Sequence, residues 1–377
     1  MASSLRLALL MGPASPVPAT WAPAPQPLAD ALQSVQVTST AGQANGFQLT
    51  FATSARSVIT TQLLPAGFFD PRARVIIVAI VAGTPVVLMD GVVTRQDVGP
   101  SDEPGASTLT LTGEDLSVLM DLDHQRACWP AMAPDERAAA ICAKYAVYGV
   151  VPAVVPLVIP YVAPPNEQIP IQSSTDLAYL KAMASQAGYV FFVNPGPAPG
   201  ASIAYWGPQV RVGPLQPALT IGMGAATNVE SLSFSFDGLS RTQYAISYTE
   251  PNSKMSIDIP VPDISLLHPP LAARPAIALR TEPLPDISDL KPAQIALLGL
   301  SRTSTSADAV TGQGKLDVLR YGHVLKAREL VSVRGAGLAY DGAYYVTSVT
   351  HEIKRGEYKQ SFSLARDGLV SLTQEVI

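Results

Sequence analysis

Two long alternating segments near the C-terminus constrain the fold more than any other feature of the chain. They lie within residues 333–369 and are joined by Lys354-Arg355-Gly356-Glu357, where Gly356 can take a positive φ and reverse the chain. Successive side chains of a strand point to opposite faces. One predicted face of the first segment carries Tyr345, Thr347, Val349, His351 and Ile353, and the other carries Tyr344, Val346, Ser348 and Thr350. The return segment alternates through Tyr358, Gln360, Phe362 and Leu364. A hairpin of this length, with hydroxyls and charges on one side, is typical of a β-barrel wall.

The chain carries little charge for its length. Charged residues make up 15% of the 377 residues and hydrophobic residues 47%, whereas about 25% of an average soluble protein is charged. A membrane does not explain this composition, because the uncharged residues 75–89 are interrupted by Gly83-Thr84-Pro85 and a span needs roughly 20 apolar residues. Residues 145–165 carry five prolines, which prevent a spanning helix. We therefore expect burial against other protein chains and no direct membrane span.

Charge and cysteine content exclude several functional classes. The net charge is −5 and the 25 basic residues are scattered, so nucleic-acid binding has no electrostatic basis. Cys128 and Cys142 have no His or Cys partners at ligand spacing, which argues against a zinc site and a disulfide framework. Cys142 lies on the apolar stripe of a predicted helix and is expected in a core. The pattern favours folding in a reducing compartment.

Periodicity predicts a β-rich α+β fold in three portions. Residues 1–112 combine a Pro/Ala-rich arm (13–27), whose Trp21 is expected to lie against a neighbour, with strand-like segments, and Asn45-Gly46 indicates a hairpin turn. Residues 113–218 form an α/β insert, with helices over 134–144 and from Ser174 or Thr175 to Gly188. Residues 219–377 return to strands, which leaves open that the two β-rich portions are distant copies. The predicted strands outside the terminal hairpin include 34–40, 46–51, 73–81, 85–95, 107–113, 189–193, 202–207, 230–236, 242–249, 256–261 and 275–280.

Two short stretches are similar to catalytic or nucleotide-binding motifs but are incomplete. His351-Glu352 begins like the zincin motif HExxH, yet Arg355 stands where the second histidine is required. Gly312-Gln313-Gly314-Lys315 is similar to part of a P-loop, yet Ala309 replaces the first glycine and Leu316 the Ser/Thr. For this second stretch we predict a turn or loop.

A possible metal site is equally incomplete. Asp121, Asp123 and His124 form an acidic cluster at a predicted helix end, and the sequence identifies no further ligands, so a solvated helix terminus is expected. The four histidines are not arranged with an obvious nucleophile. The sequence therefore predicts no catalytic, cofactor-binding or metal-ligating residue and no cofactor.

Four ordered blocks of the sequence resemble a known family. The terminal hairpin contains G-x-Y-x-V-x-S-V-x-H (342–351) and then Y-x-Q-x-F-x-L-x-R (358–366). The other blocks are S-V-Q-V and G-F-Q-L-T-F within 34–51, T-D-L-A-Y-L, G-Y-V-F-F-V and A-Y-W-G-P within 175–208, and N-V-E-S-L-S-F-S-F-D at 228–237. In this order they resemble the tail hub proteins of contractile injection systems, which form the phage late control gene D family, and the hub portion of VgrG-type spikes.

The resemblance implies a homotrimer whose subunits each carry two tube-like β-barrels flanking the α/β insert. Residues 1–112 would hold the N-terminal arm and first barrel, 113–218 the insert, and 219–377 the second barrel. Six barrels would form a pseudo-sixfold ring between a hexameric inner tube, or its tube-initiator proteins, and a trimeric spike, with baseplate wedge proteins alongside. Internal duplication is one way to join unequal rotational symmetries. Related type VI spike proteins continue into a needle where this sequence stops at Ile377, so the spike is expected to be another polypeptide.

The sequence therefore favours a non-enzymatic structural hub that adapts the hexameric tube to the trimeric spike. Such a protein would be assembled in the bacterial cytoplasm and become a component of a phage tail or a phage-tail-like injection particle. Two alternatives stay open. One is a tail-associated peptidoglycan hydrolase, whose paired carboxylates can reside in any fold. The other is a β-rich virion adhesin with an exposed aromatic groove.

Overall fold

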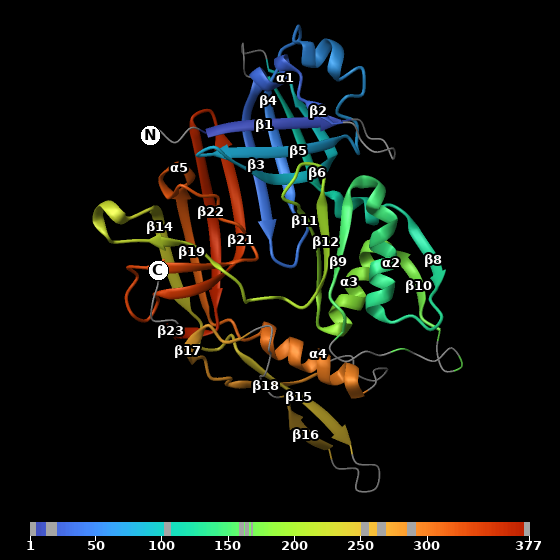
Figure 1. Ribbon diagram of the computed structural model, residues 1–377, viewed down its shortest axis with the longest axis vertical. Coiled ribbons are helices and arrows are strands. Elements are labelled where there is room, and N and C mark those ends of the chain that lie inside the picture. Colours follow the sequence, from blue (N-terminus) through green and yellow to red (C-terminus); the bar gives the residue numbers. More distant parts are fainter. Residues whose placement is uncertain are drawn as a thin grey trace.

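The computed structural model describes residues 5–12, 21–101, 107–157, 162, 166, 169–249, 256–261, 269–284 and 292–372 (Figure 1). Most of the predicted Pro/Ala arm (13–20), part of the proline-rich stretch after residue 157, and His268 lie outside the described residues. Among the helices within the described ranges, none combines the length and apolar character that crossing a membrane requires.

The N-terminal portion contributes six long strands and one short strand to the main sheet. The six long strands pair in the order β3-β4-β7-β6-β5-β1, and the short β2 (Ala22–Pro23) pairs with β1. Their bounds are β1 Leu5–Gly12, β3 Leu32–Thr40, β4 Gly46–Ala52, β5 Arg74–Val81, β6 Thr84–Gly99 and β7 Thr108–Asp115. A short helix, α1 (Gln26–Ala31), precedes β3, and the π-helix Ile59–Leu63 follows β4. We call these six strands the N-terminal set.

The C-terminal portion contributes six further strands, which pair in the order β14-β19-β22-β21-β20-β13. Their bounds are β13 Leu215–Thr220, β14 Val229–Phe236, β19 Val310–Asp317, β20 Leu330–Arg334, β21 Gly342–Lys354 and β22 Glu357–Arg366. We call them the C-terminal set. Smaller elements extend it, namely the 3₁₀ turn Gly224–Ala226, β15 Thr242–Thr249, β16 Ser256–Pro260, β17 Ala272–Pro275, β18 Arg280–Pro283, α4 Pro292–Thr305, α5 Val318–Tyr321 and β23 Gly368–Ser371.

The two sets have the same strand order. When the strands of each set are numbered in chain order, six equivalent pairs result: β1 and β13, β3 and β14, β4 and β19, β5 and β20, β6 and β21, β7 and β22. Any two strands that are neighbours in one set have equivalents that are neighbours in the other. The pairing is antiparallel at each equivalent position except one, because β1 runs antiparallel to β5 whereas β13 runs parallel to β20. The order alone therefore indicates that one six-strand unit occurs twice.

Irregularities of the backbone recur at equivalent positions in both sets. Thr94 in β6 and Thr347 in β21 each occupy a β-bulge, and each donates its hydroxyl to a carbonyl oxygen of the next strand, at 3.2 and 3.1 Å. Arg72 and Arg328 precede β5 and β20, both have positive φ, and both donate the backbone N–H to a valine carbonyl beside that bulge at 2.8 Å. Bulges and positive φ at non-glycine residues are uncommon, so these coincidences support internal duplication.

The two sets meet where β3 pairs antiparallel with the second half of β21. Seven residue pairs join them, from Ser348 opposite Thr40 to Lys354 opposite Ser34, and the result is one 13-stranded sheet. Figure 1 shows the blue strands β3 and β4 beside the red strands β21 and β22, although they are about 300 residues apart in sequence. We call this pairing the seam.

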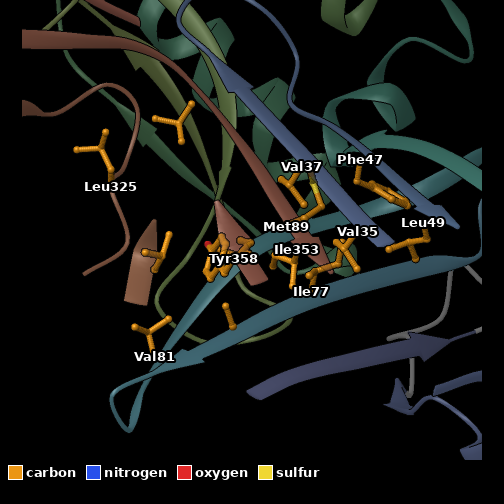
Figure 2. Close-up of a cluster of buried hydrophobic side chains, with 14 of the residues drawn as sticks. Val35, Val37, Phe47, Leu49, Ile77, Val81, Met89, Leu325, Ile353 and Tyr358 are labelled. Atoms are coloured by element: carbon orange, nitrogen blue, oxygen red, sulfur yellow. The ribbon is translucent and has the colours of Figure 1, made fainter. Parts of the chain in front are cut away.

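One hydrophobic core lies on one face of the sheet across the seam. Val35 and Val37 of β3, Phe47 and Leu49 of β4, and Ile353 of β21 are all nearly inaccessible to water and point to the same side (Figure 2). Each is an alternate residue of its strand, so period-2 patterning places the whole set on the buried face. Burying one such side chain contributes about 1.5–3 kcal/mol, and the core therefore holds the two sets together.

The insert has a second core of its own. It packs two helices, α2 (Pro134–Lys144) and α3 (Asp176–Ala187), against β9 Val150–Val154, β11 Val190–Pro195 and β12 Ser202–Gly207, with β8 His124–Cys128 paired to β10 Ile171–Thr175. The 3₁₀ turns Leu116–Met120 and Tyr145–Tyr148 complete it. The predicted caps are confirmed, since the Thr175 hydroxyl accepts from Ala178 N and Gly188 ends α3 at φ 70°. Cys142 is buried in this core as predicted.

Several local predictions are wrong. The Thr347 bulge shifts the alternation of β21, so Tyr344 and Val346 share the core face with Val349 and Ile353, while Tyr345 lies on the other side. The turn between β3 and β4 is centred on Gly42 (φ 79°), and Asn45 is buried instead. Residues 275–280 do not form one strand, because β17 ends at Pro275 and β18 begins at Arg280.

Candidate functional site

The sheet face opposite the core is polar over eight consecutive strands, from β14 to β6. Its side chains are Ser231, Ser233, Ser235, Thr311, Gln313, Lys315, Lys359, Ser361, Ser363, Ser348, Thr350, Glu352, Gln36, Thr38, Gln48, Thr50, Thr110, Thr112, Arg95 and Asp97. Each of them is partly or fully exposed, and none is apolar. We call this surface the polar face. Its extent makes it the leading functional surface of the chain.

The register aligns the polar face into rows that cross the seam. One row runs through six strands, from β22 to β6, as Lys359, Glu352, Gln36, Gln48, Thr112 and Arg95. In another row the hydroxyl oxygens of Thr38 and Thr350 lie 3.3 Å apart across the seam itself. The two sets therefore present one continuous surface.

The charges on the polar face are paired with one another. Lys315 lies 3.5 Å from Glu352, and Lys359 lies 3.0 Å from Glu230 and 3.1 Å from Glu357. The hydrogen bonds to Glu230 and Glu357 raise the pKa of Lys359. Such exposed pairs stabilise a protein little. Their consequence is a surface that carries hydroxyls, amides and compensated charges and offers neither a basic nor an apolar patch for tight binding.

A buried polar network closes the junction of the two sets and the insert. The Arg328 guanidinium donates to Asn194 Oδ1 of β11 at 2.5 Å, to the Thr40 carbonyl at 2.7 Å and to Ser39 Oγ at 3.1 Å. It also lies 4.4 Å from the centre of the Phe192 ring. Asn45 donates to the Val193 carbonyl at 2.7 Å. Sequence reasoning missed this network, because an isolated arginine before a strand carries no pattern.

The zincin-like stretch begins in the core, where His351 is buried. The Nδ1 of His351 lies 2.8 Å from the Tyr358 hydroxyl oxygen, and burial lowers the pKa of this histidine to about 4. Glu352 points to the opposite face, where it pairs with Lys315, and Arg355 lies in the turn. The structure therefore does not bring these three side chains together.

The P-loop-like stretch is a strand, so its prediction as a turn or loop is wrong. Residues 312–315 belong to β19, and added Cβ atoms at Gly312 and Gly314 would lie 2.9 Å from the Phe234 ring and 2.5 Å from the Phe362 ring. Both glycines are therefore sites of close side-chain approach on the core face. Gln313 and Lys315 lie on the polar face instead.

The acidic cluster at residues 121–124 contacts the start of α3. Asp121 accepts a hydrogen bond from the Thr175 hydroxyl at 2.5 Å, at the start of α3. Within the described residues no three His, Cys, Asp or Glu side chains gather closely enough to hold a metal ion.

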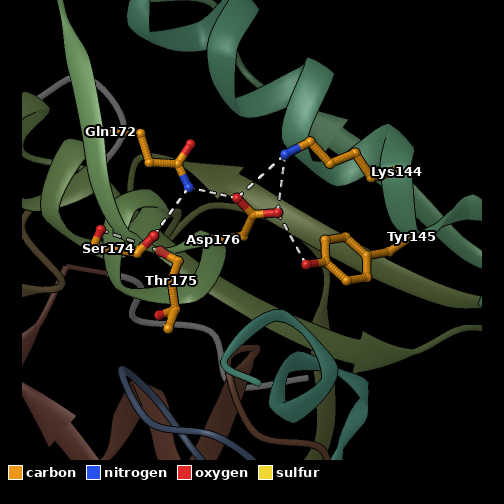
Figure 3. A network of polar contacts seen from close by, with 6 residues as sticks. All are labelled: Lys144, Tyr145, Gln172, Ser174, Thr175 and Asp176. Carbon is orange, nitrogen blue, oxygen red and sulfur yellow. Dashed lines mark hydrogen bonds and ion pairs between the residues drawn. The ribbon is translucent and has the colours of Figure 1, made fainter. Parts of the chain in front are cut away.

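The neighbouring Asp176 is the centre of a structural network in the insert (Figure 3). Its carboxylate accepts from Gln172 Nε2 at 2.6 Å, from the Tyr145 hydroxyl at 3.0 Å and from Lys144 Nζ at 3.2 Å. Burial, and then the nearby Asp176 charge, raise the pKa of the Cys142 thiol to about 12. A thiol that stays protonated at neutral pH is a poor nucleophile. The network therefore fixes the start of α3 against α2.

Comparison with known proteins places the fold. No protein-family model and no curated protein matches the chain. Among solved structures, a 43 kDa tail protein of prophage MuSo2 from Shewanella oneidensis matches with a TM-score of 0.63 and 13% identity, over 97% of this chain and 100% of that one. A tail protein from Neisseria meningitidis MC58 matches with a TM-score of 0.59 and 14% identity, over 97% and 98%. The chain has the fold of phage tail proteins.

The same tail-protein fold occurs in a larger protein. A chain of the PdpA–VgrG complex from Francisella matches with a TM-score of 0.61 and 9% identity, over 99% of this chain and 54% of that one. At such identities the likeness concerns the fold. The expected β-rich fold with a helical insert is confirmed at this level, whereas the two-barrel trimeric ring is not tested by it.

Proposed function

We propose that the chain is the structural hub of a contractile injection system or phage-tail baseplate, and that it adapts a hexameric inner tube to a trimeric spike. The observation that carries the proposal is the internal duplication. Each chain presents the same six-strand unit twice, joined edge to edge at the seam. Three such chains would present six similar units. A threefold assembly with six similar units can contact each of the six subunits of a tube ring.

The division into domains follows from the same proposal. Residues 1–112 hold the N-terminal arm and the first tube-like barrel, 113–218 the insert, and 219–377 the second barrel. Both boundaries move to strand ends, because β7 of the first barrel runs to Asp115 and β13 of the second begins at Leu215. The proposed partners are two further copies of the chain, a trimeric spike protein, inner-tube or tube-initiator proteins and baseplate wedge proteins. Assembly takes place in the bacterial cytoplasm, and the product is a phage tail or a phage-tail-like injection particle.

The polar face fits the wall of a channel through such a ring. A wall past which other molecules move has to be wetted and must not bind them strongly. Hydroxyls, amides and internally paired charges meet both conditions, because they hold water and leave little net charge or apolar area. Work of this kind is mechanical and needs no catalytic residue.

Light scattering on the purified full-length chain tests the proposal. The expected result is a molar mass three times the 39.6 kDa of one chain. A clean monomer at micromolar concentration, with no ring in electron micrographs, would contradict it. Peptidoglycan zymography tests the hydrolase alternative, for which a clearing band abolished by mutation of an acidic residue is the diagnostic result.

A further inference from the structure

The seam shows how one six-strand unit joins another. In the seam, the first strand of the N-terminal pairing order, β3, pairs with the second half of β21, beyond its Thr347 bulge. The first half of β21 pairs with β20 instead. A single chain therefore contains one completed junction between units, with a defined register.

The chain also contains both halves of a second junction, left unjoined. The equivalent of β3 is β14, whose only strand partner among the described residues is β19. The equivalent of the second half of β21 is residues 94–99 of β6, beyond the Thr94 bulge. These residues pair with β7 on one side, whereas β5 pairs with β6 only as far as Val92. The free edge of β14 is therefore equivalent to the edge of β3 that the seam covers. The free edge of residues 94–99 is equivalent to the edge of β21 that the seam covers.

Exposure distinguishes the joined edge from the free one. Within the seam, Val349 and His351 of β21 are buried. All six residues 94–99 of β6 are exposed, and Val98, the equivalent of His351, is exposed to 51%. Phe236 at the end of β14 is exposed to 43%. Uncovered strand edges that carry apolar side chains are normally protected in native proteins.

We propose that residues 95–99 of β6 in one copy pair antiparallel with residues 233–237 in the next copy, which comprise the end of β14 and the residue that follows it. This inference rests on the proposed trimeric hub and specifies its subunit contact. Transferring the seam register through the equivalent strands places Arg95 opposite Asp237, Asp97 opposite Ser235, and Gly99 opposite Ser233. The first pair has opposite charges. On the core face the same register brings Val98 opposite Phe234 of the neighbouring copy.

The contact is head-to-tail, and this fits a closed ring. The edges that pair are different, so every copy offers β6 to one neighbour and β14 to the other, which is a heterologous interface. Closure after three copies leaves neither edge exposed, and the polar face continues around the ring. Strand addition of this kind derives its affinity from main-chain hydrogen bonds, and the partner is a second copy because both edges belong to the same chain.

Disulfide trapping tests the register. Asp97 and Ser235 are equivalent to Thr350 and Thr38, which lie directly opposite each other in the seam with side-chain oxygens 3.3 Å apart. Cysteines at directly opposite positions of neighbouring strands are close enough to form a disulfide. The variant is Asp97→Cys with Ser235→Cys in a Cys128→Ser background, since Cys128 is exposed. Mild oxidation is expected to convert the monomer band on a non-reducing gel into dimer and trimer bands, with nothing larger.

Three controls make the result specific. Thr38→Cys with Thr350→Cys should close a disulfide within one chain and leave the monomer band. Arg95→Cys with Ser233→Cys uses the same two strands four residues out of register, roughly 13 Å apart, and should not cross-link. A mixture of the Asp97→Cys and Ser235→Cys single variants should stop at dimer.

The outcomes separate the contact from the proposed function. A trimeric native mass with no interchain disulfide at residues 97 and 235, while the seam control oxidises, would overturn the β6–β14 contact and leave the hub proposal standing. Cross-linking by the Asp97→Cys single variant alone would also overturn it, because it would indicate a twofold contact. A monomeric native mass would overturn both.

Discussion

Protonation of His351 should destabilise the protein by an amount that the structure allows us to calculate. The imidazole is buried beside the seam, with Nδ1 2.8 Å from the Tyr358 hydroxyl oxygen and 3.2 Å from Gln360 Nε2. Gln360 in turn bonds both backbone groups of Leu325. Burial lowers the pKa of His351 from 6.5 to about 4, because a charged imidazole cannot be solvated there.

The sign of the pH dependence follows from the depressed pKa. Below pH 6.5 the unfolded chain accepts a proton that the folded chain refuses until about pH 4. Stability is therefore complete above pH 6.5 and is lost as the pH falls toward 4. The full shift corresponds to about 3 kcal/mol, most of which should be lost between pH 7 and pH 4.5.

Urea unfolding at these two pH values, at one fixed chain concentration, measures the effect. His351→Gln removes the titrating group, so the variant should lose about 2 kcal/mol less than the wild type between pH 7 and pH 4.5. His323→Gln replaces an exposed histidine and should behave like the wild type. Equal acid losses in wild type and His351→Gln would refute the reasoning.

Three further substitutions test the junctions of the fold. Arg328→Met should cost about 3 kcal/mol, because it removes the donor of partly buried acceptors and of the buried Asn45. Arg72→Met, at the equivalent but exposed position, should change the free energy of unfolding by less than about 0.5 kcal/mol. Equal losses in urea unfolding would contradict the network. Thr347→Val should cost about 1 kcal/mol by removing the bulge hydrogen bond, and unchanged urea unfolding would show that the bond contributes nothing. Gly200→Ala would place a Cβ 2.1 Å from the Trp21 ring, which would displace the ring and shift tryptophan fluorescence to the red. Gly42→Ala is the control, because its Cβ has open space. Identical spectra of the two variants would show that Trp21 does not pack against Gly200.

The sequence predicted those elements whose signals are local. Residues 134–144 form α2 with the predicted bounds, since Pro134 and the acidic first turn mark its start. The terminal hairpin reverses at Gly356 with φ 78°. Strands β3, β4 and β15 also lie where alternation placed them. In each case period and end signals agree within one short window.

The rest depends on contacts that no short window contains. The Thr347 bulge changes which sheet face the side chains of half of β21 occupy, and no sequence signal marks it. Within β19, two glycines make room for Phe234 and Phe362 of the neighbouring strands. The seam joins residues about 300 positions apart, so pairing, register and the continuity of the polar face could not be predicted. The sequence left open that the two β-rich portions are copies, and which strands correspond became visible only through strand order and equivalent bulges.

The shape of the assembled particle tests the central claim most directly. Electron cryo-microscopy of the purified full-length chain, averaged in end-on views, should show six similar lobes around a central opening with threefold density from the inserts outside them. Particles with one isolated lobe pair, or a closed twofold dimer, would contradict the claim that three duplicated chains form the ring.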